Sequence, residues 1–90
     1  MLQSISNFLE TTHFNRFDDF SDNNGYLQFS NCGIEGEILI ITIQRNGDNA
    51  FINFEVNGKL IPNEGLEISS LKEFKEFFKT NIEPYGAYVD

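Results

Sequence analysis

Apolar and polar residues alternate along the middle of the chain, from Glu37 to Ile61, and a period of two is typical of β-strands. Two Asn-Gly pairs, Asn46-Gly47 and Asn57-Gly58, divide this stretch into three runs. Such a pair between β-rich runs is a strong hairpin signal, because a type I′ turn needs positive φ at both central residues. The pattern therefore predicts a three-strand antiparallel meander.

The register of the first hairpin depends on its loop length. A two-residue loop at Asn46-Gly47 pairs Arg45 with Asp48, whereas a four-residue loop over 46–49 slides the pairing by two. Either register keeps each residue on the same face, because side chains alternate with period two. The face that we expect to line the core carries Leu39, Ile41, Ile43, Ile52, Phe54 and Val56. The other face carries Ile38, Ile40, Thr42, Phe51, Asn53 and Glu55.

The second Asn-Gly turn places Val56 opposite Lys59 and puts Leu60 beside Glu55. Pro62 then ends this strand, because proline cannot donate to a ladder, and a short strand of this kind is predicted at a sheet edge. An apolar strip thus lies on the face opposite the core, made of Ile38, Ile40, Phe51 and Leu60.

A helix is predicted near each end of the chain. Within residues 2–12, one stripe at helical spacing is formed by Leu2, Ile5, Phe8 and Leu9. Ser70 and Glu73 fit a capping box that begins a second helix, Pro84 marks its end, and residues 85–90 form a tail. The second helix has an apolar face of Leu71, Phe74, Phe77, Phe78 and Ile82 and a basic flank of Lys72, Lys75 and Lys79.

Between the first helix and the central strands, Phe14, Phe17 and Phe20 recur at a spacing of three, which we interpret as core filling in a separate turn. A polar loop follows, and Tyr26 to Phe29 alternates as a short strand. Together the elements predict a single domain over residues 1–90, of the α+β class. It is a two-layer fold in which an antiparallel β-meander of three to four strands carries an N-terminal and a C-terminal helix packed on one face.

Charge narrows the classes of partner. Fourteen acidic residues against six basic ones give a net charge of −8. Such a balance repels nucleic acid and anionic membranes and favours a basic protein partner. The single Cys32 excludes an internal disulfide, and the sequence contains neither an apolar run of membrane-spanning length nor a secretory signal. We therefore expect a cytoplasmic protein.

Candidate catalytic and metal sites fail on spacing. In the acidic run before Gly25, the calcium-loop pattern would put Phe20 at the first ligand position. Cys32 and His13 are single and have no third residue to orient them as a nucleophile pair. No glycine-rich phosphate loop is present. We expect no catalytic residue, no metal and no cofactor, and hence a protein that is not an enzyme.

The remaining constellation is a set of carboxylates on loops. The expected partner-binding acids are Asp18, Asp19, Asp22, Glu35, Glu37 and Asp48, with Asp48 at the opposite hairpin tip from the others. Carboxylates spaced along a rigid surface can imitate a row of phosphates. The alternative is that net charge serves solubility alone. Phe51 and Tyr85 are the candidate apolar anchors, because charges steer while aromatic side chains hold.

In size, charge and element order, with its two Asn-Gly hairpins and its final helix from Leu71 to Phe78, the chain resembles the small acidic anti-CRISPR proteins of phages. The resemblance implies a non-enzymatic inhibitor that binds a CRISPR effector in the host cytoplasm and blocks nucleic-acid access. Two alternatives remain open. The first alternative is an immunity protein that neutralises a toxin nuclease. The second is a structural protein that forms a homodimer through the outer strip of Ile38, Ile40, Phe51 and Leu60.

Overall fold

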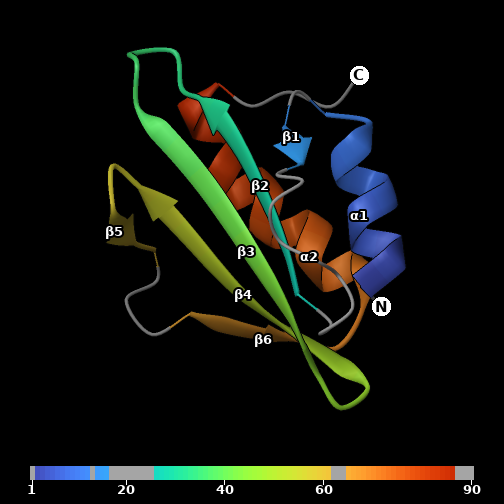
Figure 1. Cartoon of the computed structure of the whole chain (residues 1–90). Helices are drawn as coiled ribbons and strands as arrows, with labels where there is room; N and C mark the ends of the chain where they lie inside the picture. Colours follow the sequence, from blue (N-terminus) through green and yellow to red (C-terminus); the bar gives the residue numbers. More distant parts are fainter. Residues whose placement is uncertain (1, 13, 17–25, 62–64, 87–90) are drawn as a thin grey trace.

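The computed structural model describes residues 2–12, 14–16, 26–61 and 65–86. In chain order the elements are α1 (Leu2–Glu10), β1 (Asn15–Arg16), β2 (Tyr26–Cys32), β3 (Ile38–Asn46), β4 (Asn49–Val56), β5 (Lys59–Leu60), β6 (Leu66–Ile68) and α2 (Leu71–Phe77). Among these residues, six strands form one antiparallel sheet in the order β1-β2-β3-β4-β5, with β6 also paired to β4. Both helices pack on one face of the sheet (Figure 1), so the predicted α+β fold is confirmed.

The β3–β4 hairpin adopts the second of the two predicted registers. Arg45 pairs with Ala50 and Asn46 with Asn49, so the turn centres on Gly47-Asp48 and the two-residue loop at Asn46-Gly47 is wrong. Gly47 has φ +63°, and Asp48 has no positive φ. A type II′ turn requires positive φ only at its first central residue, which glycine supplies at little cost. The slide by two leaves the predicted faces unchanged.

The β4–β5 turn is the predicted Asn57-Gly58 turn. Both residues have positive φ, 53° and 85°, as a type I′ turn requires. Val56 pairs with Lys59, as expected. The Asn57 side chain also accepts a hydrogen bond from the backbone N–H of Ile38 at 2.9 Å, which joins this turn to the start of β3. Pro62 lies outside the described residues.

The core lies between the sheet and the two helices. All predicted core residues of β3 and β4 are buried except Val56, which is half-buried at the end of β4. Phe8 of α1 meets Phe74 and Phe78 edge-to-face, with ring centroids 5.9 and 5.3 Å apart, and this cluster joins the helices. The fully buried large side chains are Ile5, Leu9, Phe29, Leu39, Ile41, Ile43, Ile52, Phe54, Ile68, Phe74, Phe78 and Ile82.

The strands extend further than the sequence pattern predicted. β2 continues to Cys32, and β1 and β6 are strands where loops were expected. α1 ends at Glu10, after which the buried Thr12 hydroxyl donates to the Leu9 carbonyl at 2.6 Å and accepts from the Phe14 N–H at 3.2 Å. This pair of bonds turns the chain and places Phe14 in the core. Phe17 and Phe20 lie outside the described residues.

The C-terminal helix begins as predicted and ends later. The Ser70 hydroxyl accepts from the Glu73 N–H at 3.2 Å, but the Glu73 carboxylate binds the Ser69 hydroxyl instead of completing the capping box. A π-helical turn (Phe78–Ile82) and a 3₁₀ turn (Glu83–Tyr85) follow α2. Pro84 lies in the first positions of the last turn, where its missing N–H is not needed, and Gly86 with φ +96° ends the turn. The tail predicted over residues 85–90 was expected either to dock or to fray, and Tyr85 docks on the core. Residues 87–90 lie outside the described residues.

Candidate protein-binding surface

The predicted acidic residues do not form one cluster in the described part of the chain. Glu35 and Glu37 lie in the β2–β3 loop, residues 33–37, and Asp48 lies in the β3–β4 turn. These loops flank opposite ends of the nine-residue β3, roughly 27 Å apart at about 3.4 Å per residue. Asp18, Asp19 and Asp22 fall outside the described residues.

Much of the net negative charge belongs to residues outside the described ranges. Nine of the 14 acidic residues and all six basic residues fall within the described ranges, so these ranges carry a net charge of −3. The remaining residues carry the other −5 of the total −8. Glu35 and Glu37 therefore belong to a surface that is only mildly negative by itself.

The β2–β3 loop is fixed by four hydrogen bonds. The Gly33 N–H donates to the Glu37 carbonyl at 2.8 Å, and the Gly36 N–H donates to the Gly33 carbonyl at 3.1 Å. The Ile34 N–H donates to the Tyr85 carbonyl at 2.9 Å, which ties the loop to the C-terminal turn. The Glu37 carboxylate accepts from the Glu35 N–H at 3.0 Å. Glu37 thus helps to hold the loop, whereas the exposed Glu35 side chain faces solvent.

This fixed loop presents apolar side chains to solvent. Ile34 is 72% exposed, and Ile38, at the start of β3, is 59% exposed. The Ile34 side chain lies so close to the Gly86 backbone that a Cβ on Gly86 would collide with it. Sequence reasoning did not single out Ile34, although its place between Gly33 and Gly36 was a usable signal, because an apolar residue in a glycine-flanked turn has no strand or helix to bury it.

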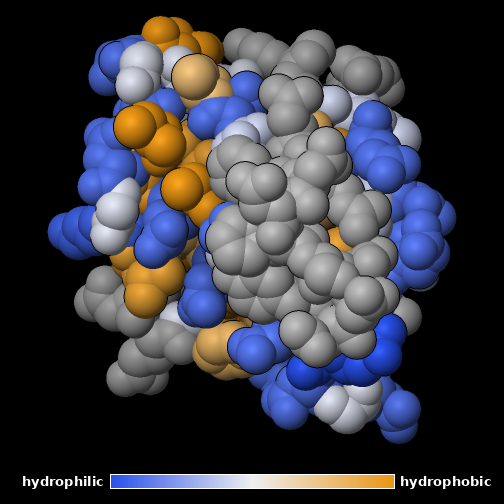
Figure 2. All heavy atoms as spheres, in the orientation of Figure 1, coloured by the Kyte–Doolittle hydropathy of each residue, from blue (hydrophilic) through white to orange (hydrophobic). Residues whose placement is uncertain are grey.

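The apolar strip on the outer face is confirmed in part. Ile38 is exposed and Ile40 and Leu60 are half-buried, with Leu60 paired beside Glu55 as predicted. Figure 2 shows hydrophobic surface along the left of this face, in separate patches divided by hydrophilic residues. We name as the outer surface two adjoining sets of residues. One is Ile38, Ile40, Glu55 and Leu60 on the outer face of the sheet, and the other is Ile34 and Glu35 of the β2–β3 loop at the end of the sheet.

The two aromatic residues predicted as anchors take part in the fold. Phe51 is half-buried, and its ring lies against the Gly65 backbone, where a Cβ would be 2.7 Å from Phe51 Cζ. Tyr85 is half-buried and packs edge-to-face on Phe54, with centroids 6.0 Å apart. Each ring therefore offers a partner only part of its surface.

At the other end of β3, charges of both signs are mixed. Asp48 and Arg45 are exposed at the hairpin tip. The Glu67 carboxylate of β6 accepts from the side-chain amides of Asn46 and Asn49, the latter at 3.3 Å. These bonds tie β6 to the tip, which explains how so short a strand is held. Asp48 is thus separated from the outer surface at Glu35.

Within the described ranges, no three His, Cys, Asp or Glu side chains lie close enough to hold a metal ion, and no helix is long and apolar enough to cross a membrane. Comparison of the chain with models of protein families, with curated proteins and with solved structures found no match. A functional proposal therefore rests on the surface of this chain.

Proposed function

We propose that the chain is a non-enzymatic inhibitor of the phage anti-CRISPR type. It binds a CRISPR effector in the host cytoplasm, at the basic groove that receives nucleic acid, and blocks access to it. The observation that carries the proposal is Ile34, which is 72% exposed next to the exposed Glu35. Its loop is held by three backbone hydrogen bonds and by one bond to the Glu37 carboxylate.

A rigid loop with an exposed apolar side chain favours tight binding for two reasons. Burying an isoleucine side chain is worth about 1.5–3 kcal/mol. The loop is already ordered, so little conformational entropy is lost when a partner covers it. Ile38 is close by in sequence and is also exposed, so the two side chains can share one contact area.

The charge supplies orientation and speed of association. The net charge of −8 attracts a basic groove over long range, and the carboxylates of Glu35 and Glu55 border the apolar residues of the outer surface. Asp18, Asp19 and Asp22 add three charges from a segment outside the described residues. In this proposal the acids steer the encounter and the isoleucines hold the complex.

The test is inhibition of DNA cleavage by an RNA-guided type II nuclease. We expect the chain to inhibit when it is added before target DNA and to fail when DNA is already bound. Ile34→Ser should weaken inhibition about tenfold to a hundredfold, from the lost burial. Thr80→Ala, at an exposed position of the C-terminal helical segment, is the matched control and should inhibit normally.

Two results would refute the proposal. One is full inhibition by two separate variants, Ile34→Ser and the triple variant Asp18→Lys, Asp19→Lys and Asp22→Lys. The other is an affinity that does not change between about 50 and 500 mM salt, a range over which exposed charges become screened. Inhibition of a toxin nuclease in place of the CRISPR nuclease would favour the immunity-protein alternative, which uses the same surface chemistry.

Homodimerisation is a second candidate, supported by the apolar side chains of Ile38, Ile40 and Leu60 on one sheet face. Light scattering distinguishes it. A mass of about twice 10.3 kDa that falls to the monomer value in Ile38→Asp would support a dimer through the outer surface. A monomer at all concentrations would exclude it.

A further inference from the structure

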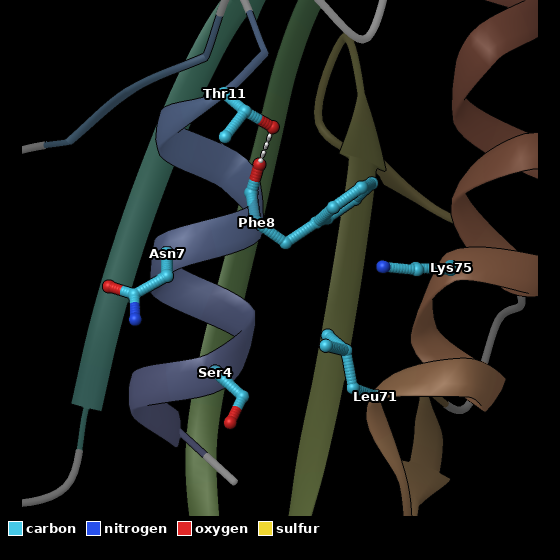
Figure 3. Close-up of a pocket in the computed structure, with 6 residues that line it drawn as sticks. All are labelled: Ser4, Asn7, Phe8, Thr11, Leu71 and Lys75. Atoms are coloured by element: carbon cyan, nitrogen blue, oxygen red, sulfur yellow. Dashed lines mark hydrogen bonds between the residues drawn. The ribbon is translucent and has the colours of Figure 1, made fainter.

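A groove runs between α1 and α2, on the opposite side of the sheet from the outer surface. It has a volume of about 470 Å³ and is lined by Ser4, Asn7, Phe8 and Thr11 of α1 and by Leu71 and Lys75 of α2. Phe8 and Leu71 are half-buried and the other four are exposed. Figure 3 shows Phe8 and Lys75 pointing toward each other across the groove, with Leu71 one turn away on α2.

The shape of the groove favours a segment of a macromolecule. Small-molecule sites bury most of the ligand in a concave pocket. Here no lining residue is buried, so a small ligand would keep much of its surface in water. A peptide segment lying along the groove can instead insert one side chain and gain further contacts with both helices.

The chemistry of the groove selects an anionic group next to an apolar one. Among the described residues, Lys75 is the only charged one that lines it. Its ammonium group lies 5.4 Å from the centroid of the Phe8 ring, a cation–π distance. The ring in turn is held edge-to-face by Phe74 and Phe78, so the cation lies over a fixed apolar wall. Ser4 adds a hydroxyl on the α1 side.

The remaining polar groups are consistent with one carboxylate and not with a polyanion. The Thr11 hydroxyl already donates to the Phe8 carbonyl at 2.6 Å, and the Asn7 side chain accepts from Gln3 at 2.8 Å on the rim. Glu10, the one acidic residue of α1, and the exposed Glu76 of α2 lie on the helices that form the groove. A nucleic acid would bring a row of phosphates that the single Lys75 cannot neutralise, whereas one carboxylate can pair with it.

We propose that the α1–α2 groove binds a segment of a partner protein in which an apolar side chain lies on Phe8 and Leu71 and one neighbouring carboxylate pairs with Lys75. This site has the opposite charge preference to the outer surface and lies on the opposite side of the sheet. The protein can then contact two protein surfaces at the same time, one at the outer surface and one in the groove. The proposal is independent of what the outer surface binds.

The test is an NMR titration of the full-length, isotope-labelled chain. The ligand is a short, capped, alanine-rich helical peptide with one leucine and one glutamate four residues apart, and its control has glutamine in place of glutamate. We expect the first peptide to shift the backbone amides of Ser4, Phe8, Thr11, Leu71 and Lys75. The control should bind about 1.4- to fivefold more weakly, the range for an exposed ion pair.

Substitution of the lysine separates charge from shape. Lys75→Met keeps a long apolar side chain and removes the cation. It should therefore bind the glutamate peptide about 1.4- to fivefold more weakly and no longer distinguish the two peptides. Lys59→Met, in β5, is the matched control and should bind as the unaltered chain does. A folded Lys75→Met with unchanged affinity would overturn the proposal. So would shifts confined to the outer surface, or a single-stranded oligonucleotide that shifts the groove amides more than the peptide does.

Discussion

At the scale of single residues, the β2–β3 loop depends on two glycines for different reasons. Gly36 has φ +85° and nothing within 4 Å of the position of a Cβ, so only backbone conformation requires glycine there. At Gly33, by contrast, a Cβ would collide with the Glu37 carboxylate and lie 3.0 Å from the Tyr85 carbonyl oxygen. Conformation governs the first position and space governs the second.

We expect Gly36→Ala to lower the free energy of unfolding by about 1–2 kcal/mol, the cost of an L-residue in the left-handed region. Gly36→Asn should recover a large part of this loss, because asparagine tolerates positive φ, as Asn57 does at φ 53° in the same sheet. Urea denaturation of the three proteins measures the difference. Equal stability of all three would show that the loop does not need this conformation.

The residue scale also shows where sequence reasoning fell short. Faces of β3 and β4 were predictable because alternation fixes them whatever the register. The role of Tyr85 was not, because it depends on a ring contact with Phe54 and a hydrogen bond with Ile34, both far away in the sequence. The role of Glu37 was not either, because the bond from the Glu35 N–H to its carboxylate depends on how the loop folds. Glu37, whose carboxylate accepts a loop N–H, and Glu35, whose side chain faces solvent, are the same residue type, so the sequence does not distinguish their roles.

At the scale of elements, long periodic segments were predicted, and short ones were missed unless a turn signal marked them, as Asn57-Gly58 did for β5. β3 and β4 have nine and eight residues, enough for several alternations. β1 and β6 have two and three, too few for a period to be visible. β6 is a strand because β4 offers it a free edge at Ala50–Ile52 and because Glu67 binds the asparagines of the hairpin tip. Both causes are tertiary.

The start of α2 gives a test at this scale. Ser70→Ala removes the acceptor for the Glu73 N–H and should lower the free energy of unfolding by about 1 kcal/mol, within the 0.5–2 kcal/mol range of N-cap substitutions. Ser69→Ala is the control, because the bond from Ser69 to Glu73 joins two exposed side chains and leaves no backbone group without a partner. It should cost less than 0.5 kcal/mol by the usual range for surface substitutions. Thermal or urea unfolding compares them, and an equal loss would show that Ser70 does not act as the cap.

At the scale of the whole molecule, stability and binding respond to salt in opposite directions. The net charge of −8 on 90 residues creates self-repulsion in the compact state. Salt screens this repulsion, and it also screens attraction to a basic partner. The proposed function therefore predicts that the free chain becomes more stable under the conditions that weaken its complex.

We expect the unfolding free energy to rise by about 1 kcal/mol between about 50 and 500 mM sodium chloride, which corresponds to roughly 4–8 °C in Tm for a domain of this size. The triple variant Asp18→Asn, Asp19→Asn and Asp22→Asn carries −5 in place of −8 and should show a smaller rise. Calorimetry of both proteins in the two buffers measures this. A Tm that is independent of salt would mean that the acidic residues are too far apart to repel one another.

The bond between Ile34 and Tyr85 has a practical consequence for how the protein is handled. Because that bond places Gly86 against Ile34, an affinity tag fused after Asp90 would start only four residues from the outer surface. Immobilisation through such a tag would hinder access to the outer surface, and a genuine ligand could then be scored as a non-binder. A tag at the N-terminus, next to α1, avoids this artefact when the outer surface is studied. When the α1–α2 groove is studied, the tag belongs at the C-terminus instead.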